Sequence, residues 1–104
     1  VVRNYNMMGP VKAALESAVR YAAAELGPKG ISVHALSPGP LMTRAASGIG
    51  HFDDLLDDAA TRAPMHQLVT IDDVGAVAAF LASDEARNLT GGVHDIDGGF
   101  SIIA

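Results

Sequence analysis

Residues 30–40, GISVHALSPGP, predict a β-strand that ends in a sharp turn. Between Ile31 and Leu36, β-branched and small residues alternate after Gly30, which is a pattern typical of strands. We expect the segment 37–40 to end the strand, because proline and glycine are the strongest local signals for turns. The elements on either side of this strand then decide the fold class.

A long helix is predicted before the strand. Between Val11 and Leu26, apolar residues recur at spacings of three and four, which is the helical period. They are Val11, Leu15, Ala18, Val19, Ala22 and Leu26. Gly27-Pro28 should stop this helix, since neither residue favours its continuation.

The segment 41–70 differs in composition from the elements around it. Gly48, Gly50 and Pro64 suit a mobile excursion more than a core element. We expect a short helix from Asp53 to Ala60, so we interpret the segment as a loop with a helical lid. Four carboxylates of that helix fall three and four residues apart and are expected to face solvent: Asp53, Asp54, Asp57 and Asp58.

A second helix and a second strand complete the pattern. Thr70 and Asp73 resemble a capping box ahead of apolar residues with helical spacing, so a helix is predicted to about Ala82. The segment 93–97 then predicts a short strand that ends at Gly98-Gly99. A strand, a crossover helix and a strand make a parallel pair, which indicates an α/β layered fold.

Two strands alone do not make a stable parallel sheet, so we expect the chain to be part of something larger. The sequence starts at Val1 and shows no glycine-rich phosphate-binding turn, which a dinucleotide-binding fold needs. We therefore expect residues 1–104 to be the carboxyl-terminal part of a single Rossmann-type domain, a parallel sheet with flanking helices, without its amino-terminal cofactor half.

Composition narrows the class of protein further. The chain is 49% hydrophobic and 18% charged, which fits an ordinary globular domain. It has no cysteine and no apolar run of membrane-spanning length, so we expect a cytoplasmic protein with no membrane partner. A net charge of -5 disfavours binding to nucleic acid phosphates.

Tyr5 and Lys12 are the first candidates for chemistry. On a helix, seven residues turn through about 700°, so both side chains would share one face. An ammonium near a phenol stabilises its anionic form, which helps the phenol donate a proton to a developing oxyanion. The alternative is an interfacial tyrosine and a solvated lysine. If Pro10 is the first helical residue, Tyr5 lies in the preceding loop and the shared-face argument weakens.

The stretches NYNMMGPVKAALESAVRYAAAELGPKGISVHALSPGP, TRAASGI and VHDIDGGFS resemble the bacterial enoyl-acyl-carrier-protein reductases of fatty acid synthesis. These enzymes belong to the short-chain dehydrogenase/reductase superfamily. Most of that superfamily has three residues between the site tyrosine and lysine, whereas this subfamily has six, as between Tyr5 and Lys12. The resemblance implies NADH as cofactor, an enoyl-acyl-carrier-protein substrate and a homotetramer.

The same resemblance implies roles for single residues. Tyr5 would hydrogen-bond the thioester carbonyl of the substrate, and Lys12 would hold the nicotinamide ribose. A turn after the first strand would bind the cofactor through Gly39, Pro40, Leu41 and Thr43. A flexible loop would close over the acyl chain, with an apolar wall of Met8, Ala45, Ala46, Ile49 and Phe52.

Other readings stay open. The turn at 37–40 is also compatible with a tight turn that binds nothing, and the chain with a non-catalytic fragment that only self-associates or with another short-chain dehydrogenase/reductase. As an isolated chain we expect it to be inactive. We assign no metal, because the four histidines show no ligand spacing with one another: His34, His51, His66 and His94.

Overall fold

The computed structural model of the chain describes residues 1, 3, 5–41, 43 and 50–103. These residues form two compact units, one built from residues 1–35 and 78–94 and the other from residues 36–77 and 95–104. The boundary between the units falls inside the strands Ala35–Pro38 and Val93–Ile96 and inside the helix Ile71–Leu81. Each of these three elements therefore contributes residues to both units.

The helix α1 (Met8–Leu26) belongs to the first unit and begins three residues before the predicted start. Pro10 lies in its first turn, where backbone N–H groups have no intrahelical acceptor, so the missing N–H of proline is tolerated. The N–H of Val11 makes an early helical bond to the carbonyl of Met7 at 3.2 Å. The predicted end at Leu26 is confirmed, and the 3₁₀ turn η1 (Gly27–Lys29) follows.

Small side chains form the buried part of the first unit. Val19 and Ala23 are the buried residues of α1, and Ala86 is the buried residue of the 3₁₀ turn η3 (Asp84–Ala86). A Cβ atom placed on Gly91 would lie 3.4 Å from the methyl group of Ala23. The chain entering the second strand therefore passes close to α1 at a small residue.

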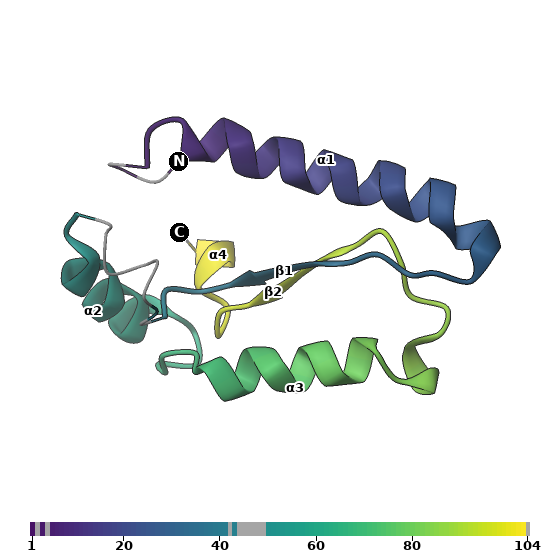
Figure 1. The fold of residues 1–104 in the computed structure, drawn as a ribbon. Helices are drawn as coiled ribbons and strands as arrows, with labels where there is room; N and C mark the ends of the chain where they lie inside the picture. Colours follow the sequence, from purple (N-terminus) through teal and green to yellow (C-terminus); the bar gives the residue numbers. More distant parts are fainter. Residues whose placement is uncertain (2, 4, 42, 44–49, 104) are drawn as a thin grey trace. The chain divides into compact units, whose positions relative to one another are not determined.

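The strands β1 (Ala35–Pro38) and β2 (Val93–Ile96) form a two-stranded parallel sheet, and they run side by side in Figure 1. The N–H of Ala35 donates to the carbonyl of Gly92 at 3.0 Å, and the N–H of Gly39 donates to the carbonyl of Ile96 at 2.9 Å. Both chains advance by four residues between these bonds, which is the pattern of parallel strands. The predicted α/β class is confirmed.

The predicted bounds of the first strand, Ile31 to Leu36, are wrong. β1 starts at Ala35 and continues through Pro38, which was expected to lie in the turn. Pro38 is tolerated because only every second residue of a strand faces a given neighbour, and Ala35 and Gly39 are among the residues that donate toward β2. The nitrogen of Pro38 therefore faces away from β2, and the sheet loses no bond.

The helix α2 (Phe52–Arg62) lies in the second unit and confirms the short helix predicted between Asp53 and Ala60. Its buried residues are Phe52 and Ala59. The short helix α4 (Phe100–Ile103) packs against it and was not predicted. Arg62 connects the two helices, because its guanidinium donates to the carbonyl of Ile103 at 3.4 Å and lies 5.7 Å from the centre of the Phe100 ring.

Three of the four α2 carboxylates are exposed, as predicted: Asp53, Asp54 and Asp57. Asp58 differs, since it is half-buried and forms an ion pair with Arg62 at 3.1 Å. The two residues are four apart on one helix, which places a carboxylate and a guanidinium within reach.

The helix α3 (Ile71–Leu81) starts with the predicted capping box. The N–H of Thr70 donates to Oδ2 of Asp73 at 2.8 Å, and the N–H of Asp73 donates to the hydroxyl oxygen of Thr70 at 3.2 Å. The bond from the Thr70 backbone, and then that from its side chain, lowers the pKa of Asp73. The prediction of a helix that begins at this box is confirmed.

Candidate cofactor and substrate site

Tyr5 lies outside α1, in the turn that leads into the helix. Its carbonyl accepts the N–H of Met8 at 3.1 Å, and the intervening Asn6 has a φ of 55° in the left-handed region. Tyr5 is half-buried, whereas Lys12 is exposed on the second turn of α1. The expectation that Tyr5 and Lys12 share a helix face is therefore wrong, because only Lys12 is helical. The position of the phenol is set by the turn.

In the second unit, the predicted cofactor turn follows the carboxyl end of β1. Gly39, Pro40, Leu41 and Thr43 are half-buried there. Ligands of open α/β sheets bind beyond the carboxyl ends of strands, so the position agrees with the prediction. The cofactor roles of these residues stay predictions.

Gly39 lies against the end of β2. A Cβ atom on Gly39 would meet the Cβ of Asp97 at 3.1 Å and the Cα of Asp97 at 3.2 Å. One of these atoms is backbone and cannot swing aside. A side chain here would have to push the strand ends apart by a few tenths of an ångström, so their close approach favours glycine at this position.

Asp97 caps the start of α4, a role that was not anticipated. Its Oδ1 accepts the N–H of Gly99 at 2.9 Å and its Oδ2 accepts the N–H of Ser101 at 2.8 Å. Burial raises the pKa of Asp97, but the bonds from the Ser101 side chain and from the backbone outweigh it, so the pKa is lowered overall. In the sequence, Asp97-Gly98-Gly99 signals only the end of a strand.

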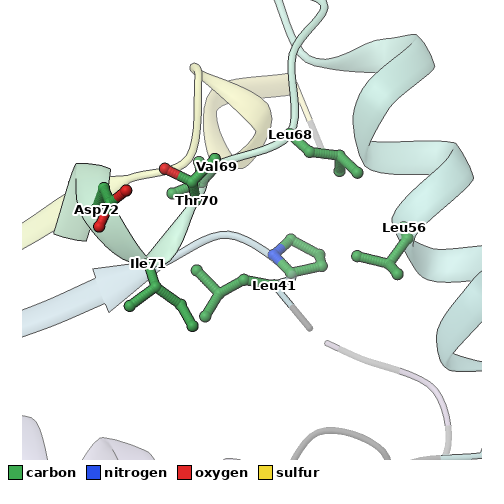
Figure 2. Close-up of a pocket in the computed structure, with 8 residues that line it drawn as sticks. Leu41, Leu56, Leu68, Val69, Thr70, Ile71 and Asp72 are labelled. Atoms are coloured by element: carbon green, nitrogen blue, oxygen red, sulfur yellow. The ribbon is translucent and has the colours of Figure 1, made fainter. Parts of the chain in front are cut away.

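An apolar hollow of about 370 Å³ adjoins the cofactor turn within the second unit. Figure 2 shows side chains from three segments extending toward it: Leu41 after β1, Leu56 on α2 and Leu68 before α3. Pro40, Val69, Thr70, Ile71 and Asp72 complete the lining. Its volume lies within the range of small-molecule pockets, roughly 300–1,000 Å³. No periodic pattern in the sequence marks this set, because three separate segments supply it.

The predicted apolar wall is only partly described. Met8 is the exposed first residue of α1, and Phe52 is buried at the start of α2. The other three, Ala45, Ala46 and Ile49, lie outside the described residues. Among the residues that the structure describes, the hollow is lined by a different set, and the roles of Met8 and Phe52 stay predictions.

Two histidines that are far apart in the sequence meet in the first unit. Nδ1 of His34 lies 3.0 Å from Nε2 of His94, and the rings are tilted by 50°. The described part of the chain contains no group of three His, Cys, Asp or Glu side chains able to hold a metal ion. Within that same part, no helix combines the length and the apolar character needed to cross a membrane.

Similar solved structures define the class of protein. The crystal structure of the Bacillus cereus enoyl-acyl carrier protein reductase with NADP+ and indole naphthyridinone has a TM-score of 0.96 and 45% identity, covering 100% of this chain and 40% of that chain. The Aquifex aeolicus VF5 enzyme has a TM-score of 0.92 and 45% identity, covering 98% and 39%. The two parallel strands and their helices are thus those of a Rossmann-type α/β fold.

Sequence similarity then gives the family. The family described as Enoyl-(Acyl carrier protein) reductase matches residues 1–101, and the chain belongs to this family of the short-chain dehydrogenase/reductase superfamily. Enoyl-[acyl-carrier-protein] reductase [NADH] FabI of Escherichia coli (strain K12) is 50% identical over 103 residues, which are 99% of this chain and 39% of that protein. The Bacillus subtilis (strain 168) protein of the same name is 45% identical over 104 residues. The chain spans about 40% of the length of these relatives.

Proposed function

We propose that this chain is the carboxyl-terminal part of an NADH-dependent enoyl-acyl-carrier-protein reductase of bacterial fatty acid synthesis. The observation that carries the proposal is 45–50% identity to reductases of that name over nearly the whole chain. Tyr5 and Lys12 lie inside the matched residues, with the six-residue separation of the subfamily. The whole enzyme would work in the cytoplasm as a homotetramer.

Tyr5 and Lys12 have different tasks in this proposal. Addition of hydride to a conjugated double bond builds enolate charge on the thioester oxygen, and the Tyr5 hydroxyl stabilises that charge by donating a hydrogen bond. The ammonium of Lys12 holds ribose hydroxyls of the cofactor. NADH supplies the hydride when bound.

The residues beyond β1 fit the nicotinamide end of the cofactor. The backbone of Leu41 offers an N–H and a carbonyl that match a carboxamide, and Thr43 offers a hydroxyl suited to a phosphate oxygen. The adjoining hollow has apolar walls, which suit a flat ring or an acyl chain. The described residues include no G-x-G-x-x-G turn between a strand and a helix, so they fit only this end of the dinucleotide.

Steady-state kinetics on the complete reductase that carries this chain test the two roles. We expect Lys12→Ala to raise KM for NADH, because cofactor binding is lost, and Tyr5→Phe mainly to lower kcat with a crotonyl thioester. Lys29→Ala and Tyr21→Phe make the same chemical changes at exposed positions and serve as controls. Unchanged cofactor affinity in the Lys12 variant would rule out its assignment.

The second candidate is a non-catalytic chain that only self-associates. Exposed apolar side chains on α1 favour it, since Val11 and Leu15 are 52% and 51% exposed and Tyr21 is 77% exposed. Calorimetric titration of the 104-residue chain with NADH separates the candidates. Micromolar binding by this chain alone would contradict the proposal that it is a part, whereas activity that appears only on mixing with an amino-terminal half would support it.

A further inference from the structure

The side chain of Asp97 is held rigidly by its own turn. Both carboxylate oxygens accept backbone N–H groups, from Gly99 at 2.9 Å and from Ser101 at 2.8 Å. Charge-assisted bonds of this kind are stronger than bonds between neutral groups. With both oxygens engaged, the Cβ of Asp97 has little freedom to move.

That immobile Cβ lies against the cofactor turn. It would be 3.1 Å from a Cβ on Gly39, and the N–H of Gly39 donates to the neighbouring carbonyl of Ile96 at 2.9 Å. The backbone hydrogen bond to Ile96 and the contact with the Asp97 side chain thus both set the distance between Gly39 and the end of β2. The place where the chain leaves β1 is fixed against Asp97.

The same turn also holds the segment that leaves α2. The carbonyl of Gly98 accepts the N–H of Met65 at 3.1 Å, and a Cβ on Gly99 would come within 2.9 Å of the Pro64 ring. The turn therefore contacts two segments of the second unit, the exit of β1 and the exit of α2. Two residues that line the hollow follow these exits: Leu41 comes after β1, and Leu68 comes after α2.

We propose that Asp97 is a positioning residue for the reductase reaction. By holding its turn against Gly39, it sets where the backbone of the cofactor turn meets the nicotinamide end of NADH. This inference rests on the proposed function, since it needs that turn to bind the cofactor. It assigns Asp97 no contact with the reacting atoms.

Kinetics on the complete reductase separate positioning from general stability. We expect Asp97→Ala to raise KM for NADH about tenfold, with kcat at saturating NADH changed less than about threefold, because the turn is displaced while Tyr5 is untouched. Asp97→Asn keeps an acceptor for Gly99 and should restore part of the affinity. The control is Asp95→Ala, an exposed carboxylate on β2.

A double-mutant cycle tests the contact itself. Gly39→Ala should also weaken NADH binding, and its effect should shrink in the Asp97→Ala background, because residue 97 can then move away. Gly27→Ala, where a Cβ meets nothing within 4 Å, is the matched glycine control.

The outcomes of these experiments distinguish failure of the proposed function from failure of the positioning role of Asp97. A wild-type complete protein that neither binds nor oxidises NADH overturns the proposed function. A wild-type protein that turns over NADH, with Asp97→Ala unchanged in KM or with fully additive effects in the cycle, overturns the positioning role alone. A variant whose unfolding midpoint and kcat fall together while KM stays constant also overturns it.

Discussion

Gly98 and Gly99 are neighbours with positive φ, yet the structure predicts unequal costs for the same substitution. Gly98 has a φ of 63°, and a Cβ there would meet its nearest atoms at 3.5–3.8 Å, which is ordinary contact. Gly99 has a φ of 89°, and a Cβ there would lie 2.9 Å from Cγ and 3.1 Å from Cδ of Pro64. A left-handed conformation costs a residue with a side chain about 1–2 kcal/mol.

Only Gly99→Ala adds a collision to that conformational strain. Overpacking costs about 1–3 kcal/mol, so we expect Gly99→Ala to lower the free energy of unfolding by roughly 2–5 kcal/mol and Gly98→Ala by roughly 1–2 kcal/mol. The ring of Pro64 cannot rotate out of the way, because its atoms are tied to the backbone.

Urea unfolding at one fixed protein concentration measures the difference, since oligomerisation makes stability depend on concentration. Adding Pro64→Ala to Gly99→Ala removes the colliding Cγ and Cδ and should recover part of the loss. Equal midpoints for the two glycine variants, or no recovery with Pro64→Ala, would refute the steric reasoning.

Three further predictions follow from local geometry. Gly75→Ala in α3 should stabilise the protein by about 0.5–1 kcal/mol, measured by thermal unfolding, because a Cβ there meets nothing within 4 Å and alanine favours helix. Thr70→Val should lower the free energy of unfolding by about 1 kcal/mol in urea, because the acceptor for the Asp73 N–H is lost, whereas Thr70→Ser should not. The lowered pKa of Asp97 implies a stabilisation that is present above its ordinary value of 3.8 and is lost as pH falls through the folded value. Asp97→Asn should therefore flatten the fall of the unfolding midpoint between pH 4 and more acid conditions, and an unchanged slope would contradict this.

Local patterns in the sequence were sufficient for the end of α1 and the start of α3. The spacing of apolar residues up to Leu26, the turn at Gly27 and the box at Thr70 act within a few residues, and the structure confirms all three. The bounds of β1 were missed because they depend on a partner far along the chain, the carbonyl of Gly92 for the N–H of Ala35.

The residues of the candidate site also divide into those that a sequence pattern reveals and those that depend on tertiary contacts. Spacing and resemblance both pointed to Tyr5 and Lys12, and the structure bears out the alternative that Tyr5 lies in the loop before the helix. The turn at Asn6 was not predicted. Two contacts have no signature in either segment alone: that of Gly39 with Asp97 and that of His34 with His94. Such contacts arise only from tertiary pairing.

Pro38 also affects the edge of β1 that faces away from β2. Its ring occupies the place of the N–H that a strand on that side would use, so Leu36 is the last donor in that direction. A third strand added there finds no N–H donor on β1 beyond Leu36, although the carbonyl of Pro38 can still accept a bond. Because residue 40, the next one on that side, is also proline, this edge offers no donor between Leu36 and Leu41, and sheet pairing is discouraged from continuing past Gly39.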